Sequence, residues 1–226
     1  MHIPIAQPSL GNEESDAVLA VLASGMIAQG PVTAAFEEEF AAYCGVPHAV
    51  AVSNGTTALH AALLAAGVGP GDEVIVPAFT FFATASSVSM CGARPVFADV
   101  DAATATIDPA DILAKVTPKT KAVIGVHLYG QPCDAGAIRK ICDDRGLVFI
   151  EDAAQAHGAE YHGRRTGALG DLACFSFYAT KNLATGEGGM VTTGSDEYDQ
   201  HLRRLINHGQ SEKYLHTELG YNYRMT

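Results

Sequence analysis

Seven short apolar runs, bounded by glycine, proline and aspartate, constrain the fold of this chain more than any other feature. Several are nearly continuous in apolar residues. Such runs are typical of strands buried on both faces, and therefore of a largely parallel sheet covered by helices. The predicted strands are "AVAV" from Ala49, "EVIV" from Glu73, "PVFADV" from Pro95, "KAVIGVHL" from Lys121, "LVFIE" from Leu147, "LACFSFY" from Leu172 and "GGMVTT" from Gly188.

Segments of helical period alternate with these runs. "TTALHAALLAAG", "FATASSVSMCG" and "DAGAIRKICDDRG" each end on a glycine, which is a common helix terminator. Two amphipathic helices, "NEESDAVLAVLASG" and "TAAFEEEFAAYCG", come before the first strand. The predicted fold class is α/β, with three α/β/α layers and a mostly parallel seven-stranded sheet. In this architecture, ligands are expected at the carboxyl ends of the strands.

Polar or aromatic residues follow four of the predicted strands. "SNGTT" follows the first strand and opens a helix, and Thr80 and Phe81 follow the second. Asp152 follows "LVFIE", and Lys181 follows "LACFSFY". Because the carboxyl ends of parallel strands meet at one edge of a sheet, these groups are expected to converge there.

Each group alone has an ordinary structural explanation. Ser53 and Asn54 suit a helix N-cap, Asp152 suits a paired strand end, Phe81 suits a core, and Lys181 suits a side chain that reaches solvent. Together they suit one ligand. A helix N-terminus binds phosphate, an aromatic ring stacks on a planar ring, a carboxylate holds a ring nitrogen protonated, and a lysine forms a Schiff base with an aldehyde. Those are the parts of pyridoxal 5′-phosphate.

Composition excludes several other classes. The 226 residues are 48% hydrophobic, with a formal net charge of −11, which argues against nucleic acid and a membrane surface as partners. No run is apolar enough to span a membrane, and the N-terminus has no signal-peptide pattern, so the cytoplasm is the expected compartment. The five cysteines form no CxxC pair and suit buried, reduced thiols. The nine histidines show no metal-ligand spacing, so no metal site is predicted.

Six blocks carry a family resemblance: "SNGTTALH", "GDEVIVPAFTFFATA", "HLYGQP", "EDAAQAHGA", "GDLACFSFYATKNLATGEGGMV" and "GYNYRM". In this order they resemble the DegT/StrS-type sugar-nucleotide aminotransferases, which have the fold-type-I architecture of pyridoxal-phosphate enzymes. The resemblance implies an amino transfer from L-glutamate to a nucleotide-linked keto sugar.

The resemblance also implies roles for single residues. Lys181 forms the covalent link to the cofactor, Asp152 contacts the pyridine nitrogen, Gln155 lies by the ring hydroxyl and Phe81 stacks on the ring. The phosphate-binding residues are Gly55, Thr56, Thr57 and Ser176. In the family, the segment similar to "GYNYRM" crosses a homodimer interface. Asn222 is therefore expected to contact the phosphate in the partner's site, so that the two chains share their active sites.

Members of the family continue beyond "GYNYRM" into a small C-terminal domain. Residues 1–226 are therefore expected to form the N-terminal segment and the cofactor-binding large domain, without that small domain. Two alternatives remain beside the aminotransferase. One is a sugar dehydratase, although that branch carries histidine where this chain has Lys181; the other is an inactive, cofactor-binding regulatory protein.

Two features beside the predicted site have weaker interpretations. The glycines in "TGEGG" lack the spacing of a nucleotide-binding loop and are expected to form tight turns beside the cofactor. Glu187, within that stretch, has no assigned role. His157, close after Asp152, is a candidate for contacting the residues of the site without contacting the ligand.

Overall fold

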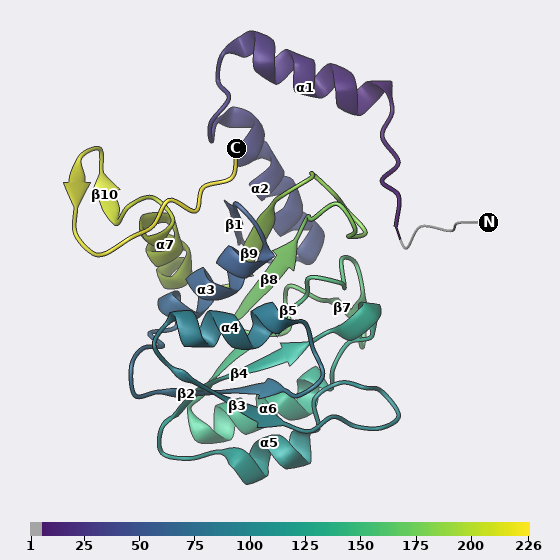
Figure 1. The fold of residues 1–226 in the computed structure, drawn as a ribbon, viewed down its shortest axis with the longest axis vertical. Helices are drawn as coiled ribbons and strands as arrows, with labels where there is room; N and C mark the ends of the chain where they lie inside the picture. The colour runs from purple at the N-terminus through teal and green to yellow at the C-terminus, as the bar shows by residue number, and fades with distance from the viewer. Residues whose placement is uncertain (1–5) are drawn as a thin grey trace.

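A seven-stranded sheet forms the centre of the computed structural model, which describes residues 6–226 (Figure 1). All seven predicted strands are present, and only β9 runs antiparallel to its neighbours. In spatial order the strands are β1 (His48–Val52), β9 (Gly189–Thr193), β8 (Leu172–Ser176), β5 (Val148–Asp152), β4 (Thr120–Val126), β2 (Glu73–Pro77) and β3 (Arg94–Ala98).

Helices cover both faces of this sheet, which confirms the three-layer α/β/α prediction. One face packs against α3 (Gly55–Ala65), α4 (Phe82–Met90) and α7 (Asp196–Leu205). The other face packs against α2 (Pro31–Cys44), α5 (Pro109–Lys115) and α6 (Ala135–Arg145).

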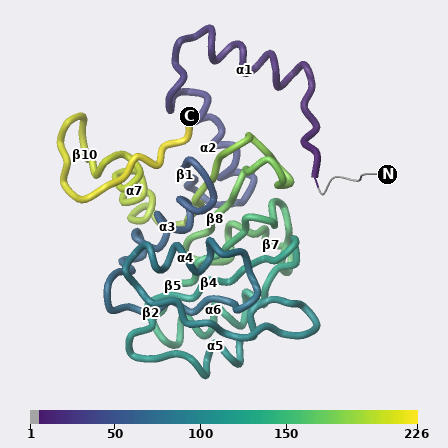
Figure 2. Tube along the Cα trace, viewed as in Figure 1, coloured from purple at the N-terminus to yellow at the C-terminus, as the bar shows by residue number. Residues whose placement is uncertain are grey.

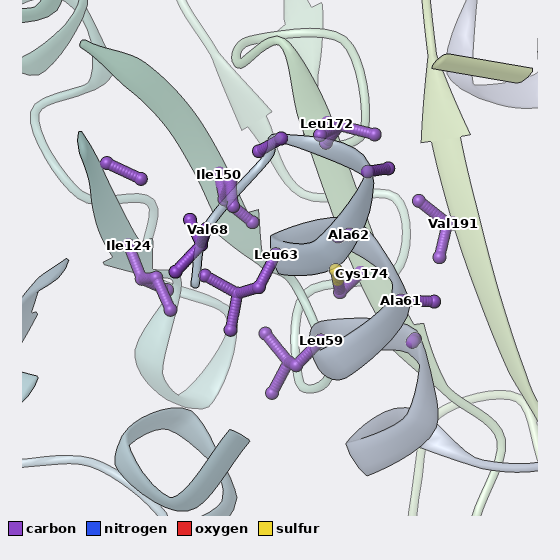
Figure 3. Close-up of a cluster of buried hydrophobic side chains, with 14 of the residues drawn as sticks. Leu59, Ala61, Ala62, Leu63, Val68, Ile124, Ile150, Leu172, Cys174 and Val191 are labelled. Atoms are coloured by element: carbon purple, nitrogen blue, oxygen red, sulfur yellow. The ribbon is translucent and has the colours of Figure 1, made fainter. Parts of the chain in front are cut away.

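The strand alternation explains how one sheet supports two cores. Val50 and Val52 of β1 join the cluster beneath α3, whereas Ala49 and Ala51 join the cluster beneath α2. Figure 3 shows the first cluster, in which Leu63 of α3 lies among side chains of the central strands. Both faces are apolar because both are buried, as the nearly continuous runs predicted.

Helix α1 (Asn12–Ser24) differs from the others. It stands away from the sheet in Figures 1 and 2, and it has no buried residue. Leu19 and Leu22 are 61% and 58% exposed. The amphipathic pattern correctly predicted this helix, but residues 6–226 provide no core beneath it.

Several short elements have no counterpart in the sequence prediction. They are α5, α7, the 3₁₀ turn η1 (Leu128–Gly130), and the hairpins β6 (Glu160–Tyr161) with β7 (Arg164–Arg165) and β10 (Gln210–Glu212) with β11 (Leu215–His216). Helix α7 shows the reason, because it buries only Leu202 and Leu205. Acidic residues in its first turn and Arg203 and Arg204 in its last turn complement the helix dipole. Within residues 6–226, every helix is too short or too polar to cross a membrane.

Glu151 ties the central strands together from a fully buried position on β5. Its Oε2 accepts hydrogen bonds from Nε2 of His127 at 2.9 Å and from the N–H of Gly167 at 3.0 Å. Its Oε1 accepts from the N–H groups of Leu169 at 2.7 Å and Gly170 at 2.8 Å. Four donors therefore compensate a carboxylate that would otherwise be costly to bury.

We predict that Glu151→Gln strongly destabilises the fold. An amide in place of one oxygen turns N–H groups toward backbone donors, and we expect the free energy of unfolding to fall by about 3–5 kcal/mol. Thermal unfolding of the full-length protein, followed by circular dichroism, measures the effect. Glu38→Gln, on the exposed side of α2, is the matched control. Equal melting temperatures for the two variants would contradict this role of Glu151.

Candidate active site

A cavity of about 650 Å³ opens at the carboxyl edge of the sheet. Its walls come from the segments that follow β1, β2, β4, β5 and β8. The segment before β9 also contributes, because an antiparallel strand begins where its neighbours end. Of the predicted site residues, those that line the cavity are Gly55, Thr56, Thr57, Phe81, Asp152, Gln155, Ser176 and Lys181. The predicted convergence of these side chains is therefore present.

The first turn of α3 forms one end of the cavity. Asn54 caps this helix, since its Oδ1 accepts the N–H of Thr57 at 2.9 Å. The N–H groups of Gly55 and Thr56, and the hydroxyls of Thr56 and Ser176, donate no hydrogen bond to any part of the described chain. Such unused donors at a helix N-terminus are suited to an anion.

Gly55 allows α3 to approach β8 closely. A Cβ atom at this position would lie 2.7 Å from Cβ and 3.2 Å from Oγ of Ser176. Only glycine therefore lets the free N–H groups of α3 and the hydroxyl of Ser176 face the same space.

The structure uses Thr57 differently from the other predicted phosphate ligands. Its N–H donates to Asn54 Oδ1, and its hydroxyl donates to the Asn54 carbonyl at 2.8 Å. Both donors of Thr57 thus complete the cap. Its contact with a phosphate stays a prediction that would need the hydroxyl to rotate.

Asp152 also lines the cavity, and its side chain is buried. Oδ2 accepts the hydroxyl of Thr84 on α4 at 2.8 Å, and Oδ1 accepts the N–H of Ala154 at 3.3 Å. Burial raises the pKa of this carboxyl above its usual value, although the hydrogen bonds and Lys181 act in the opposite direction. A cationic partner in the cavity would relieve that penalty.

Gln155 is held in one orientation by the backbone. Its Oε1 accepts the N–H of Tyr129 at 2.8 Å, and an N–H can only donate. The amide NH₂ group is therefore the end of Gln155 that remains free to donate. Tyr129 has a positive φ of 53°, so this contact depends on an uncommon backbone conformation.

Lys181 lies in the turn after β8, where its N–H donates to the Tyr178 carbonyl at 2.8 Å. Its side chain is half-buried in the cavity wall. Burial lowers the pKa of the amine, while the negative charge of Asp152 raises it. A lowered pKa increases the fraction of neutral amine, which is the form that attacks an aldehyde.

Phe81 lines the cavity as the N-cap of α4, with 73% of its surface exposed. The core interpretation of this aromatic side chain is therefore wrong, since the ring covers no apolar cluster. Its flat face is available to a ligand.

Two residues at this site were missed as candidates. Thr84 fixes Asp152 from a position 68 residues earlier in the chain, and no local spacing reveals such a pair. His127 lines the cavity at the end of β4. Its Nδ1 accepts the Cys133 N–H at 3.2 Å, so Nε2 carries the proton that Glu151 accepts, and the ring is neutral.

His157 and Asn222 lie outside the cavity wall of this chain. The ring of His157 packs against Phe175 and Phe177, at centroid distances of 5.4 and 5.6 Å, and burial lowers its pKa to about 4. Asn222 is exposed, and its backbone bridges to Asn207. Its contact with a partner's cofactor stays a prediction.

Comparison with known proteins identifies the family of this chain. The profile of the DegT/DnrJ/EryC1/StrS aminotransferase family matches residues 8–226. The chain belongs to this family. It is 48% identical over its whole length to a GDP-perosamine synthase from Caulobacter vibrioides, and covers 62% of that protein.

Other relatives widen the range of names within the family. The chain is 49% identical, again over its whole length, to a dTDP-3-amino-3,4,6-trideoxy-alpha-D-glucose transaminase from Streptomyces venezuelae, and covers 60% of it. A Streptococcus pneumoniae protein solved in its PLP-form superimposes with a TM-score of 0.95 at 32% identity, covering all of this chain and 64% of that one. The chain thus spans about three fifths of the length of these proteins.

The residues of the cavity fit pyridoxal 5′-phosphate. The unused donors of α3 and Ser176 suit its phosphate, and the buried Asp152 suits a protonated ring nitrogen. The free amide NH₂ of Gln155 suits the ring oxygen, and the Lys181 amine suits the aldehyde. Each polar group of the cofactor finds a complementary group in one cavity.

We predict that Gly55→Ala weakens cofactor binding. The added methyl group would force α3 away from Ser176, so the N–H donors would no longer face the phosphate. Losing one or two charge-assisted hydrogen bonds should raise the dissociation constant for pyridoxal phosphate about 10- to 100-fold. Titration of the full-length apoprotein with pyridoxal phosphate, followed by absorbance, measures this dissociation constant.

Gly194→Ala is the matched control, because an added Cβ there meets no atom within 4 Å. Circular dichroism of both apoproteins verifies that Gly55→Ala still folds. Unchanged affinity would mean that the phosphate does not bind at this helix end.

Proposed function

We propose that the full-length protein is a pyridoxal-phosphate-dependent aminotransferase that moves the amino group of L-glutamate to a nucleotide-linked keto sugar. The observation that carries the proposal is the juxtaposition of Lys181 and the buried Asp152 in one cavity with the unused donors of α3. Family membership and the names of the relatives support the substrate class.

When bound, the cofactor supplies an aldehyde and a ring that takes up negative charge. Gly55, Thr56 and Ser176 would hold its phosphate, and Asp152 would keep the proton on its ring nitrogen. The Lys181 amine would take the proton from Cα of the amino donor, and the resulting ammonium would deliver a proton to the sugar carbon that receives the nitrogen. Glutamate leaves as 2-oxoglutarate, and the keto sugar leaves as an amino sugar.

The proposal includes a homodimer with shared active sites, in which residues 1–226 form the N-terminal segment and the cofactor-binding large domain. Asn222 is exposed, yet the neighbouring segment is fixed to its own chain, because the Tyr223 carbonyl accepts the N–H of Ser53 at 2.8 Å. This arrangement supports presentation of Asn222 to a second chain. We also propose a cytoplasmic location, which suits five free and buried cysteines.

Borohydride reduction of the full-length protein tests the central assignment. We expect reduction to fix the cofactor covalently on Lys181, and we expect Lys181→Ala to lose both the fixed cofactor and all transfer from glutamate to a panel of nucleotide keto sugars. Peptide mass spectrometry locates the modified residue. Covalent fixation retained in Lys181→Ala would refute the assignment, whereas fixation without any amino transfer in the wild type would favour the inactive regulatory alternative.

Subunit mixing tests the shared site. Asn222→Ala and Lys181→Ala chains are each expected to be severely impaired, but a heterodimer of the two has one site with both residues intact. Random exchange makes about half of the dimers mixed, so activity should return to about a quarter of wild type. Native mass spectrometry verifies that the heterodimers form. If they form and activity does not return, Asn222 serves its own chain or no site.

A further inference from the structure

Glu187 is the second carboxylate that lines the cavity, beside Asp152. Unlike Asp152, it is exposed, and its carboxylate has no hydrogen bond or ion pair with any residue from 6 to 226. Its backbone carbonyl accepts the Thr185 hydroxyl at 2.9 Å. The chain therefore presents a charged group to the cavity without using that charge itself.

The backbone around Glu187 is fixed on both sides. The Gly186 carbonyl accepts the N–H of Ala179 at 3.2 Å, and the Gly188 carbonyl accepts the N–H of Phe177 at 2.8 Å. A Cβ atom on Gly188 would lie 2.6 Å from the Thr185 hydroxyl oxygen. These constraints hold residue 187 against the strand that carries the lysine turn, so its side chain is presented from a defined position.

The charges of the cavity indicate which ligand such a carboxylate suits. Lys181 is the only lysine or arginine among the residues that line the cavity, and the proposed function commits it to the cofactor. An amino donor that carries two carboxylates gains nothing from a third one nearby. A sugar ring, in contrast, carries neutral hydroxyl groups, and a carboxylate is the strongest acceptor that a side chain offers to them.

We propose that Glu187 accepts hydrogen bonds from hydroxyl groups of the keto sugar and thereby distinguishes the sugar from the amino donor in a cavity that both must enter. The inference rests on the proposed function and adds a residue that determines specificity. Because β9 alone is reversed in the sheet, the segment before it reaches the same edge as Lys181 and Asp152.

Measuring the two half-reactions separately tests this role. The full-length holoenzyme is reacted with L-glutamate alone, and its aminated form is then reacted with the nucleotide keto sugar that the wild type accepts best. The cofactor spectrum reports each half. For Glu187→Ala, we expect kcat/KM for the keto sugar to fall about 10- to 100-fold, the effect of losing a hydrogen bond to a charged group. The value for glutamate should change less than about 2-fold.

Glu187→Gln keeps the shape and one acceptor, so we expect a smaller loss with the same selectivity for the sugar half. Glu212→Gln, on exposed β10 outside the cavity, is the control and should change neither half. Unchanged cofactor content and circular dichroism exclude a folding defect.

The possible outcomes separate the two hypotheses. Equal losses in both half-reactions would mean that Glu187 positions the lysine turn or pairs with a cation of another chain. No loss in either half-reaction would mean that Glu187 has no role. Each of these two outcomes overturns the inference about Glu187 but leaves the proposed function standing. A wild type that reacts with glutamate but with no nucleotide keto sugar would overturn the proposed function, and the inference with it.

Discussion

Strand β5 ends in two consecutive carboxylates, and the strand alternation sends them to opposite faces of the sheet. Glu151 enters the core and receives four hydrogen bonds from His127 and the segment before β8. Asp152 faces the cavity with the Thr84 hydroxyl and one long backbone contact. The first carboxylate is fully compensated and locks the central strands in register. Asp152 has fewer hydrogen-bond partners than Glu151, and it lies on the strand that the contacts of Glu151 hold in place.

The phosphate end of the cavity depends on a comparable constraint, the close approach of two backbones. Gly55 starts α3 directly against Ser176 of β8, and Gly189 at the start of β9 lies directly against the Asn54 carbonyl. Since β9 is antiparallel between β1 and β8, its amino end and their carboxyl ends meet at one edge. A side chain at Gly55 would push the N-terminus of α3 away from β8, and a side chain at Gly189 would push it away from β9. The sheet order therefore brings the unused N–H groups of α3 to the same cavity as Lys181.

The sequence predicts the elements of the fold that a local pattern of residues specifies. Strands buried on both faces appear as apolar runs, and glycine marks the helix ends, so the layers and the convergence of Lys181, Asp152 and Phe81 follow from the sequence alone. Contacts between distant segments have no such signature. The sequence did not reveal that Thr84 would fix Asp152, or that the Asn54 cap would engage both donors of Thr57. Helix α7 was not predicted because it has few apolar residues, and only Leu202 and Leu205 among its charged side chains are buried.

The "TGEGG" stretch holds Glu187 between glycines that the backbone requires. Gly186 has a positive φ of 88°, as expected for a tight turn, but Gly188 and Gly189 are required by neighbouring atoms. Between Gly186 and Gly188 lies Glu187, the one charged residue of this stretch. A site that takes both an amino donor with two carboxylates and a nucleotide-linked keto sugar, as we propose, needs interactions that only one of them makes, because shared contacts strengthen both equally. A carboxylate at residue 187 would meet that need, since it accepts hydrogen bonds from hydroxyl groups, which the sugar has and glutamate lacks.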